Sequence, residues 1–351
     1  METADLENVP ITMVGAGAIG GTVGAYLGDA GYDVTLVDSS REHVEAIRER
    51  GLRITGARGE HTFHPRALLP EEFDGTLGTT FLCVKGHFTE EAMGWIEPRL
   101  EPDGYVLSLQ NGLNEELIAK RVGAGRAVGA FVHFGADLLE PDLVQLGYEA
   151  KIYVGELDGR ITPRVEALAA ALGHAMPAEV TDNVWGFLWG KLVFGATGFV
   201  VSCVDAPVAE VIDDPLGRAL CRAASAEAYA VARTRTDRVE PIGDFDSGSF
   251  APGEGMEARA EATLMGLADS WRGAIKQHMG IWLDLKVKRR KTEVDEQIGR
   301  IVATGRERGV HTPVNAAVLE IIHEIEAGER GMGWENLGHI SSRSGPASPV
   351  G

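Results

Sequence analysis

A single lysine interrupts an apolar, aromatic stretch of the chain, VWGFLWGKLVFGATG at residues 184–198. Apolar side chains recur there at the spacing of one helix face, which predicts a helix with a buried side formed by Trp185, Leu188, Trp189 and Leu192. A lysine beside such a face loses hydration, so Lys191 is expected either to reach water with its ammonium group or to take part in chemistry. Apolar surroundings would lower its pKa, which would suit Lys191 to proton transfer.

A glycine-rich motif near the N-terminus has the pattern G-x-G-x-x-G, at Gly15, Gly17 and Gly20. It directly follows an apolar run and opens an amphipathic segment. Glycines at this spacing allow a tight turn and bring backbone N–H groups close to a pyrophosphate at a helix N-terminus. We therefore expect this loop, with Ala18 and Ile19, to bind a dinucleotide.

The choice of dinucleotide depends on Asp38, which lies 18 positions after Gly20 at the end of the next apolar run. A carboxylate there accepts hydrogen bonds from ribose hydroxyls and repels a 2′-phosphate, which favours NAD. Arg41 is close enough in sequence to keep NADP as the alternative. Either cofactor implies hydride transfer, which needs a group that gives or takes a proton, and Lys191 is the candidate.

The composition excludes several classes of protein. The net charge of −19 over 351 residues argues against general binding of nucleic acid, which needs a surplus of Lys and Arg. No apolar run approaches about 18 residues, so no transmembrane helix and no membrane partner are expected. The N-terminal residues do not resemble a signal peptide, and three cysteines without a CxxC pair suit a reducing, cytoplasmic setting. The histidines show no metal-ligand spacing, so no metal is expected.

Apolar runs alternate with amphipathic segments in the first half of the chain. This alternation predicts a doubly wound parallel sheet of the Rossmann type. The expected strands span 11–14, 33–37, 80–84 and 104–108, with helices at 18–30, 41–50, 89–99 and 114–121. Two further strands, AVGAFVHFGADL and KIYVGEL, and the helix TPRVEALAAALG are expected to complete the domain.

Helical periodicity dominates from Thr181 onward. Helices are expected at 182–203, 215–235, 256–285, 292–308 and 313–327, the last with Thr312 as N-cap and Pro313 in its first turn. The stretch 240–255 is rich in Gly, Pro, Asp and Ser, which predicts a loop without packed structure. Such a loop is expected to act as a mobile lid or rim of the site. The expected domains are 1–181, the dinucleotide-binding domain, 182–335, an all-helical catalytic domain, and 336–351, a disordered tail.

From Ile11 to about Glu326 the chain resembles the ketopantoate reductase (2-dehydropantoate 2-reductase) family. The resemblance rests on several motifs together: GAGAIG, CVKGHFTEEA at 83–92, QNG at 110–112, WGKL at 189–192, DLKVKRRKTEVD at 284–295 and GVHTPVN at 309–315. It implies a Rossmann domain followed by a helical domain, a nicotinamide cofactor and the reduction of a 2-oxo acid.

The resemblance also implies roles for individual residues. Lys191 stands where the family has its general-acid lysine, and Glu293 matches a glutamate that contacts the substrate. Asn111 matches a residue near the nicotinamide ribose, and Lys85 matches a lysine that follows a Rossmann strand. Each residue alone has an ordinary structural explanation, but the four occur together in register.

Four positions depart from the family pattern at the place where the substrate is expected. Asparagines are replaced by Gly195 and Phe199 on the helix of Lys191, a serine by Gly280, and another asparagine by Gln277. These lost groups are the ones that grip ketopantoate, and a site that loses its hydrogen-bonding groups loses that recognition. The departures predict a different substrate.

Three functions remain open from the sequence. The first is an NAD-dependent dehydrogenase or reductase of a larger or less polar hydroxy or oxo compound. The second is a genuine NADP-dependent ketopantoate reductase, and the third is a non-catalytic dinucleotide-sensing module. Retention of both Lys191 and Glu293 counts against the sensor. The expected partner is a small molecule, and a homodimer is among the oligomeric states that the sequence leaves open.

Overall fold

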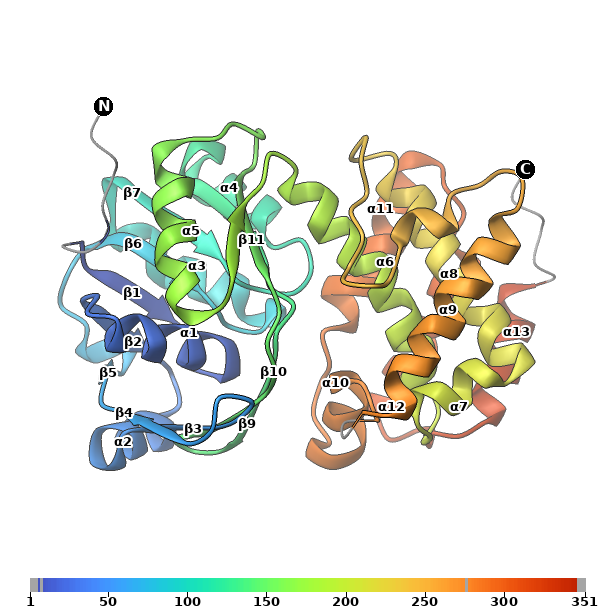
Figure 1. The fold of residues 1–351 in the computed structure, drawn as a ribbon, viewed down its shortest axis with the longest axis horizontal. Coiled ribbons are helices and arrows are strands. Elements are labelled where there is room, and N and C mark those ends of the chain that lie inside the picture. The colour runs from blue at the N-terminus through green and yellow to red at the C-terminus, as the bar shows by residue number, and fades with distance from the viewer. Residues whose placement is uncertain (1–5, 7–8, 275–276, 346–351) are drawn as a thin grey trace. The chain divides into compact units, whose positions relative to one another are not determined.

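The computed structural model describes residues 6, 9–274 and 277–345. The chain divides into two compact units, Met1–Val184 and Trp185–Gly351 (Figure 1). Each unit has its own core and is described by itself.

Eight strands form the main sheet of the first unit. They are β1 (Ile11–Val14), β2 (Val34–Val37), β5 (Arg66–Leu68), β6 (Leu77–Leu82), β7 (Leu100–Ser108), β8 (Ala127–Phe131), β11 (Ile152–Glu156) and β12 (Ala178–Val180). Their order is β12-β11-β8-β7-β6-β1-β2-β5, and neighbours run parallel except β8 and β11. The chain leaves β1 toward β2 on one side and returns to β6 on the other, which creates a switch point where ligands bind in such folds. The predicted Rossmann sheet is confirmed, although the strand expected at 80–84 begins and ends earlier.

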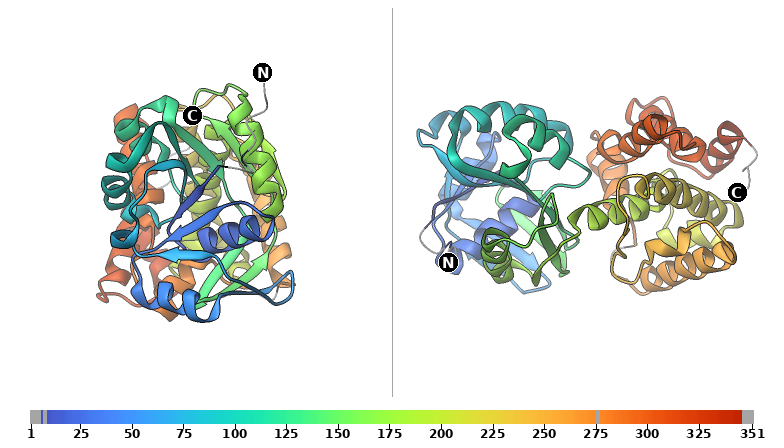
Figure 2. Two further views of the ribbon diagram at one scale, coloured as in Figure 1. Left: turned by 90° about the vertical axis from the view of Figure 1, so that its left-hand side faces the viewer. Right: turned by 90° about the horizontal axis from the view of Figure 1, so that it is seen from above.

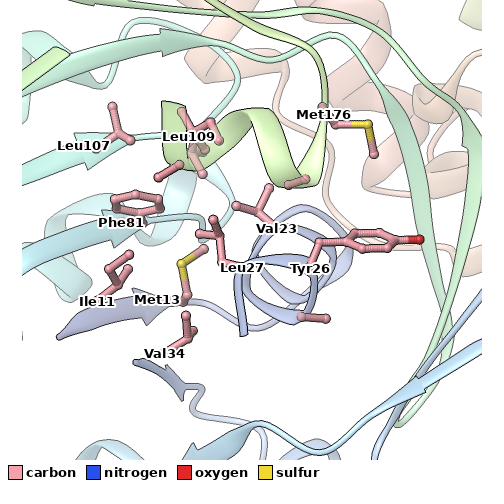
Figure 3. Packing of buried hydrophobic residues seen from close by; sticks show 14 of the residues in the cluster. Ile11, Met13, Val23, Tyr26, Leu27, Val34, Phe81, Leu107, Leu109 and Met176 are labelled. Atoms are coloured by element: carbon pink, nitrogen blue, oxygen red, sulfur yellow. The ribbon is translucent and has the colours of Figure 1, made fainter. Parts of the chain in front are cut away.

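Helices cover both faces of this sheet. On one face, α1 (Ala18–Asp29) and α5 (Pro163–Ala175) bury Val23, Leu27 and Leu168 against strand residues such as Met13 and Phe81 (Figure 3). On the other face lie α3 (Thr89–Ile96) and α4 (Glu115–Val122). The helix α2 (Arg41–Arg50) lies beside β5. Side chains of the central strands alternate between two apolar layers, which explains why these strands are continuous apolar runs.

A second, four-stranded sheet of this unit was not predicted from the sequence. It pairs β4 (His61–Phe63), β3 (Leu52–Gly56), β10 (Leu143–Tyr148) and β9 (Gly135–Glu140) in that order. The run AVGAFVHFGADL, expected to be one strand, therefore divides between β8 in one sheet and β9 in the other. The parallel pairing of β3 with β10 joins segments far apart in the chain, and no local pattern reveals such a contact.

The second unit contains helices and, within its described residues, no strand beyond the isolated bridge Ile242–Phe245 (Figure 2). Its long helices are α6 (Val184–Ser202), α8 (Pro215–Ala232), α9 (Met256–Arg272), α11 (Arg300–Arg308), α12 (Pro313–Glu326) and α13 (Glu335–Ser344). Shorter elements are α7 (Val208–Asp213), α10 (Gly280–Trp282) and the wider helical turns at Leu283–Lys288 and Asp295–Gly299. The helix expected over 256–285 is thus interrupted, ending beside Gly273 and resuming at Gly280.

The tail expected to be disordered, 336–351, is helical over most of its length. Helix α13 buries Asn336, Leu337 and Ile340, and it packs on α12. The Asn336 amide donates to the Cys203 carbonyl at 2.8 Å. The Ser- and Gly-rich composition concealed two apolar residues at helical spacing, so that prediction was wrong. Residues 346–351 lie outside the described part of the chain.

The stretch 240–255 is also packed, contrary to the expectation of a loop without packed structure. Ile242, Phe245 and Phe250 are each at most 3% exposed. The Phe245 ring meets Phe194 of α6 edge-on, with ring centroids 5.3 Å apart. Three large apolar residues therefore anchor this segment on α6, which argues against a freely moving lid.

Helix α12 begins as predicted at Pro313, but Thr312 is not its capping group. Thr312 occupies the N-cap position and makes no side-chain capping hydrogen bond there. The Glu227 carboxylate of α8 instead accepts hydrogen bonds from the backbone N–H groups of Val314 and Asn315, at 2.9 and 3.0 Å. It also accepts from the Asn315 side-chain amide at 2.8 Å. A buried carboxylate from another helix thus satisfies the N-terminus of α12.

One helix, α6, is long and apolar enough to cross a membrane by length and composition, which corrects the expectation that no segment reaches that length. Of its most apolar window, 78% is buried inside the protein. Leu188, Trp189 and Leu192 are each at most 2% exposed, so three of the four residues of the predicted buried face lie in the core, whereas Trp185 is half-buried. This burial identifies α6 as a core helix of the second unit.

Candidate active site

The glycine-rich loop follows β1 and opens α1 at the switch point of the main sheet. Gly15 has φ +95°, and a side chain there would lie 2.8 Å from the Val84 backbone nitrogen. A Cβ on Gly20 would overlap the Gly15 carbonyl oxygen. These two glycines are therefore required by the turn and by the close approach of α1 to β6.

Gly17 differs from the other two glycines of the motif. It is the N-cap of α1, it has extended backbone, and a Cβ there would meet no atom of the described residues within 4 Å. Within the described part of the chain, no side chain caps this helix end. The first N–H groups of α1 and the space above Gly17 therefore fit a dinucleotide pyrophosphate.

Gly17→Ala should separate cofactor binding from folding. The added methyl group meets open space in the protein, so the melting temperature should hardly change, while the dissociation constant for the dinucleotide should rise about 10- to 100-fold, the equivalent of about 1–3 kcal/mol of steric overlap. Titration of the tryptophan fluorescence with NADH measures this dissociation constant. Gly28→Ala is the matched control because its Cβ is equally free on the same helix. Equal affinities for both variants would contradict the assignment.

Asp38 holds the glycine-rich loop in place at the end of β2. Its carboxylate accepts hydrogen bonds from the backbone nitrogens of Ala16 and Ser40, both at 2.8 Å. Asp38 remains half-buried, so part of its carboxylate stays accessible. The residue predicted to bind ribose is thus also a structural anchor of the loop.

The other side of Ala16 is held by a buried histidine that the sequence analysis did not identify. His43 of α2 bonds to the Ala16 carbonyl through Nε2 at 2.8 Å, and its Nδ1 accepts from the Asp142 backbone N–H at 3.2 Å. These two bonds require the neutral tautomer with hydrogen on Nε2. A chain of hydrogen bonds therefore connects the loop to the turn before β10.

The series of hydrogen bonds ends at Asp142, which is completely buried and has φ +67°. Burial alone would raise the pKa of its carboxyl, but hydrogen bonds from Arg50 and Arg53, at 2.5 and 2.8 Å, hold that pKa below its ordinary value. The ion pairs fix the positive-φ turn and, through His43, the carbonyl side of the loop.

Lys85 and Asn111 follow the carboxyl ends of β6 and β7. Since β7, β6, β1 and β2 are adjacent and parallel, both residues lie at the same sheet edge as the glycine-rich loop and Asp38. The turn at Asn111 is held by the Asn114 amide, which donates to the Asn111 carbonyl at 2.7 Å. The structure thus gathers all cofactor residues predicted from the sequence at one edge.

The second unit carries the two predicted catalytic residues. Lys191 lies in the middle of α6 and is half-buried, while its neighbours Trp189 and Leu192 are in the core. Glu293 is half-buried and begins a helical turn in which its carbonyl accepts from the Gln297 backbone N–H at 3.1 Å. Thr292 fixes the start of this turn, because its hydroxyl and N–H both donate to Glu326 of α12, at 2.6 and 2.7 Å.

The segments that carry Lys191 and Glu293 approach each other at Gly195 and Gln297. Gly195 lies one turn after Lys191, and Gln297 lies one turn after Glu293, so each pair shares a face. The Gln297 side-chain oxygen lies 3.1 Å from the position that a Cβ on Gly195 would take. This contact between the second members of the two pairs supports a common site for the first members.

The four positions expected at the substrate have different surroundings. Gly195 is buried under Gln297, and Phe199 is completely buried in the core, so its ring offers no surface to a ligand. Gln277 and Gly280 are exposed, and a Cβ on Gly280 would meet no described atom within 4 Å. Of the four, the structure connects only Gly195 with the face of Lys191.

The basic run KVKRRK, residues 286–291, is engaged mainly in ion pairs. Lys286 donates to Asp205 at 2.5 Å, Arg290 pairs with Asp284 at 2.7 Å, and Lys291 pairs with Asp295 at 3.0 Å. The Trp282 indole also donates to Asp205, at 2.9 Å. A basic run of this kind can be a solvated helix end or loop, or it can face an anionic ligand, and these contacts favour the first.

Comparison with known proteins agrees with this arrangement. Residues 11–159 match the family described as Ketopantoate reductase PanE/ApbA, and residues 183–326 match its C-terminal domain. The 2-dehydropantoate 2-reductase of Archaeoglobus fulgidus is 31% identical over 91% of this chain and 98% of its own length. A 2-dehydropantoate 2-reductase from Geobacter metallireducens is 26% identical, with a TM-score of 0.76 over 90% of this chain and 99% of that structure.

A structure of D-mandelate dehydrogenase with NADH and anilino(oxo)acetate has a similar fold, with a TM-score of 0.79 at 23% identity over 91% of this chain and 99% of that one. The matches to both family domains and the relative that is aligned over nearly its whole length agree with the motifs of the glycine-rich loop and of α6. The chain belongs to the ketopantoate reductase family of nicotinamide-dependent oxidoreductases.

Proposed function

We propose that the protein is an NAD-dependent dehydrogenase or reductase that interconverts a 2-hydroxy and a 2-oxo acid less polar than ketopantoate. The observation that supports the catalytic part is the contact of Gln297 with α6 at Gly195, which lies one turn after Lys191, while Gln297 lies four residues after Glu293. Lys191 gives or takes the proton at the substrate oxygen, and Glu293 orients the substrate. The bound nicotinamide supplies or accepts the hydride.

The surroundings of the lost family contacts support a less polar substrate. Positions 195 and 280 have no side chain, so neither can supply the hydrogen-bonding group that the family pattern has there. One turn beyond Gly195, a Cβ on Gly198 would lie 3.6 Å from Ile281 and 3.9 Å from Met279. The face of α6 beyond Gly195 is thus covered by apolar side chains rather than by hydrogen-bonding groups.

A genuine ketopantoate reductase is the second candidate. It is favoured by the relative from Archaeoglobus fulgidus, a 2-dehydropantoate 2-reductase aligned over 98% of its length. In that case other residues must replace the lost asparagines and serine. Ketopantoate turnover separates this candidate from the first.

A substrate screen tests the proposal. Purified protein is assayed with NADH and NADPH against ketopantoate, phenylglyoxylate, aliphatic 2-oxo acids and neutral aryl ketones, read at the nicotinamide absorbance. We expect the highest kcat/KM with an apolar 2-oxo acid. A preference for ketopantoate would support the second candidate, and cofactor binding without turnover of any compound would support a dinucleotide sensor.

Asp38 should set the preference for NADH over NADPH. Arg41, three residues after Asp38 in the sequence, already pairs with Glu71 at 2.8 Å, which favours the carboxylate of Asp38 as the group that acts on the ribose. Asp38→Ala should weaken both cofactors, because the loop loses its anchor at Ala16, but it should weaken NADH more. The ratio of the two dissociation constants is therefore the measurement. An unmodified protein that binds both cofactors equally would refute the preference.

A further inference from the structure

The side chain of Gln297 places an amide group beside Gly195, where α6 has no side chain of its own. Its oxygen lies 3.1 Å from the ideal Cβ position of Gly195, so any larger residue at 195 would have to displace it. Gly195 is buried, and Gln297 is half-buried. The glycine therefore leaves no hole: it lets a side chain from the turn Asp295–Gly299 approach the backbone of α6.

The position of this amide relative to Lys191 is set by helix geometry. Residues four apart on a helix have Cβ atoms about 5–6 Å apart on the same face. The Gln297 side-chain oxygen, 3.1 Å from the Cβ position of residue 195, thus lies within about 9 Å of the Cβ of Lys191, close enough for one small substrate to contact both side chains. An amide can donate to a carboxylate oxygen and accept from a hydroxyl, so it suits a 2-oxo or 2-hydroxy acid.

The start of the turn is held independently of any ligand. Thr292, 1% exposed, anchors it to Glu326 of α12, and the Gln297 backbone N–H bonds to the Glu293 carbonyl. A rigidly held backbone keeps the amide at a defined place, which a specificity-determining group requires. The neighbouring cover of α6 at Gly198, Met279 and Ile281, is apolar, whereas Gln297 brings a polar group to Gly195.

We propose that Gln297 is a specificity-determining residue whose side-chain amide binds the carboxylate of the 2-oxo acid beside Lys191. This inference rests on the proposed function, since it assumes a 2-oxo acid at Lys191. Gln297, in the turn after Glu293, makes the contact with the substrate carboxylate that a glycine at position 195 cannot make.

A pair of reciprocal substitutions tests the assignment with phenylglyoxylate and NADH. Gln297→Ala should lower kcat/KM about 10- to 100-fold, as expected for a lost hydrogen bond to a charged group. Gly195→Asn alone should also lose activity because its side chain collides with Gln297. The double variant Gly195→Asn/Gln297→Ala has room for the new amide and should recover at least about 10-fold over Gln297→Ala, a coupling that independent sites do not show.

Changing the charge of residue 297 gives a second test of the contact. Gln297→Glu, similar in shape, should weaken an anionic 2-oxo acid by more than Gln297→Ala does, while the turnover of a neutral aryl ketone changes little. Gln145→Ala, an exposed residue of β10, is the control for the loss of a surface glutamine. A kcat/KM for Gln297→Ala within about twofold of the unmodified protein, or a double variant no better than the single one, would overturn the proposal.

Direct binding separates this inference from the proposed function. If the unmodified protein turns over no compound, the proposed function fails, and calorimetric titration of phenylglyoxylate into the NADH complex decides about Gln297. Weaker binding by Gln297→Ala supports its role in holding the acid. Unchanged binding, or none by the unmodified protein, overturns it.

Discussion

Replacing Lys191 with alanine should lower kcat by a factor of about 10² to 10⁴, the usual range for a lost general acid or base. The side chain is half-buried in the middle of α6, on the face that also carries Gly195 under the Gln297 amide. The dissociation constant for NADH should hardly change, because the residues predicted to bind the dinucleotide all belong to the first unit. Steady-state kinetics and a fluorescence titration measure the two quantities.

Lys151→Ala is the matched control for this experiment. That lysine directly precedes β11, is half-buried and pairs with Glu179 at 2.5 Å, so its loss should leave kcat unchanged. Glu293→Gln should also lower kcat, and the two losses should be less than additive if both residues act on one substrate. Near-normal kcat in Lys191→Ala would show that the lysine only extends from the apolar face of α6 to water.

Glu227→Ala should destabilise the second unit by about 2–4 kcal/mol, because it leaves buried donors at the start of α12 without an acceptor. The carboxylate receives the backbone N–H groups of Val314 and Asn315 and the Asn315 amide. Urea unfolding followed by circular dichroism measures the change. Glu257→Ala is the control, since Glu257 makes an exposed ion pair with Arg222 of the same helix α8 and such pairs contribute about 0–1 kcal/mol.

The difference between wild type and Glu227→Ala should depend on pH. Burial raises the pKa of the Glu227 carboxyl, and the hydrogen bonds from Asn315 and Val314 only partly oppose this. The folded protein therefore binds this proton more readily than the unfolded chain, whose pKa is about 4.3. The stability difference should widen as the pH falls from neutrality toward that value. A difference independent of pH would argue that the carboxylate is ordinarily solvated.

The parts of the site that depend on local patterns could be predicted from the sequence. The glycine-rich loop, Asp38, Lys85 and Asn111 each follow a strand of a recognisable strand–helix series, and parallel pairing then requires them to share one edge. The helix around Lys191 was predicted from its apolar periodicity. In each of these cases the necessary information lies within about one strand or one helix.

Contacts between distant segments could not be predicted in this way. His43 looks like an ordinary helix residue until Asp142, 99 positions later, is seen to donate to it. Gln297 is meaningful only beside Gly195, although its place four residues after Glu293 was a usable hint. The packed segment at 240–255 and helix α13 were missed because composition outweighed a few apolar residues whose partners lie elsewhere in the chain.

Two hydrogen bonds hold Ala16 of the glycine-rich loop and connect the loop to other parts of the first unit. Ala16 is held by Asp38 on its N–H side and by His43 on its carbonyl side, so the loop is ordered before a ligand arrives and loses little entropy on binding. His43 also bonds to the Asp142 backbone N–H, so stabilisation of Ala16 by a ligand should be transmitted to the turn at Asp142, and any such coupling is reciprocal. If the loop binds the dinucleotide, the amide exchange rates of β3 and β10 in the four-stranded sheet should fall when the cofactor is added.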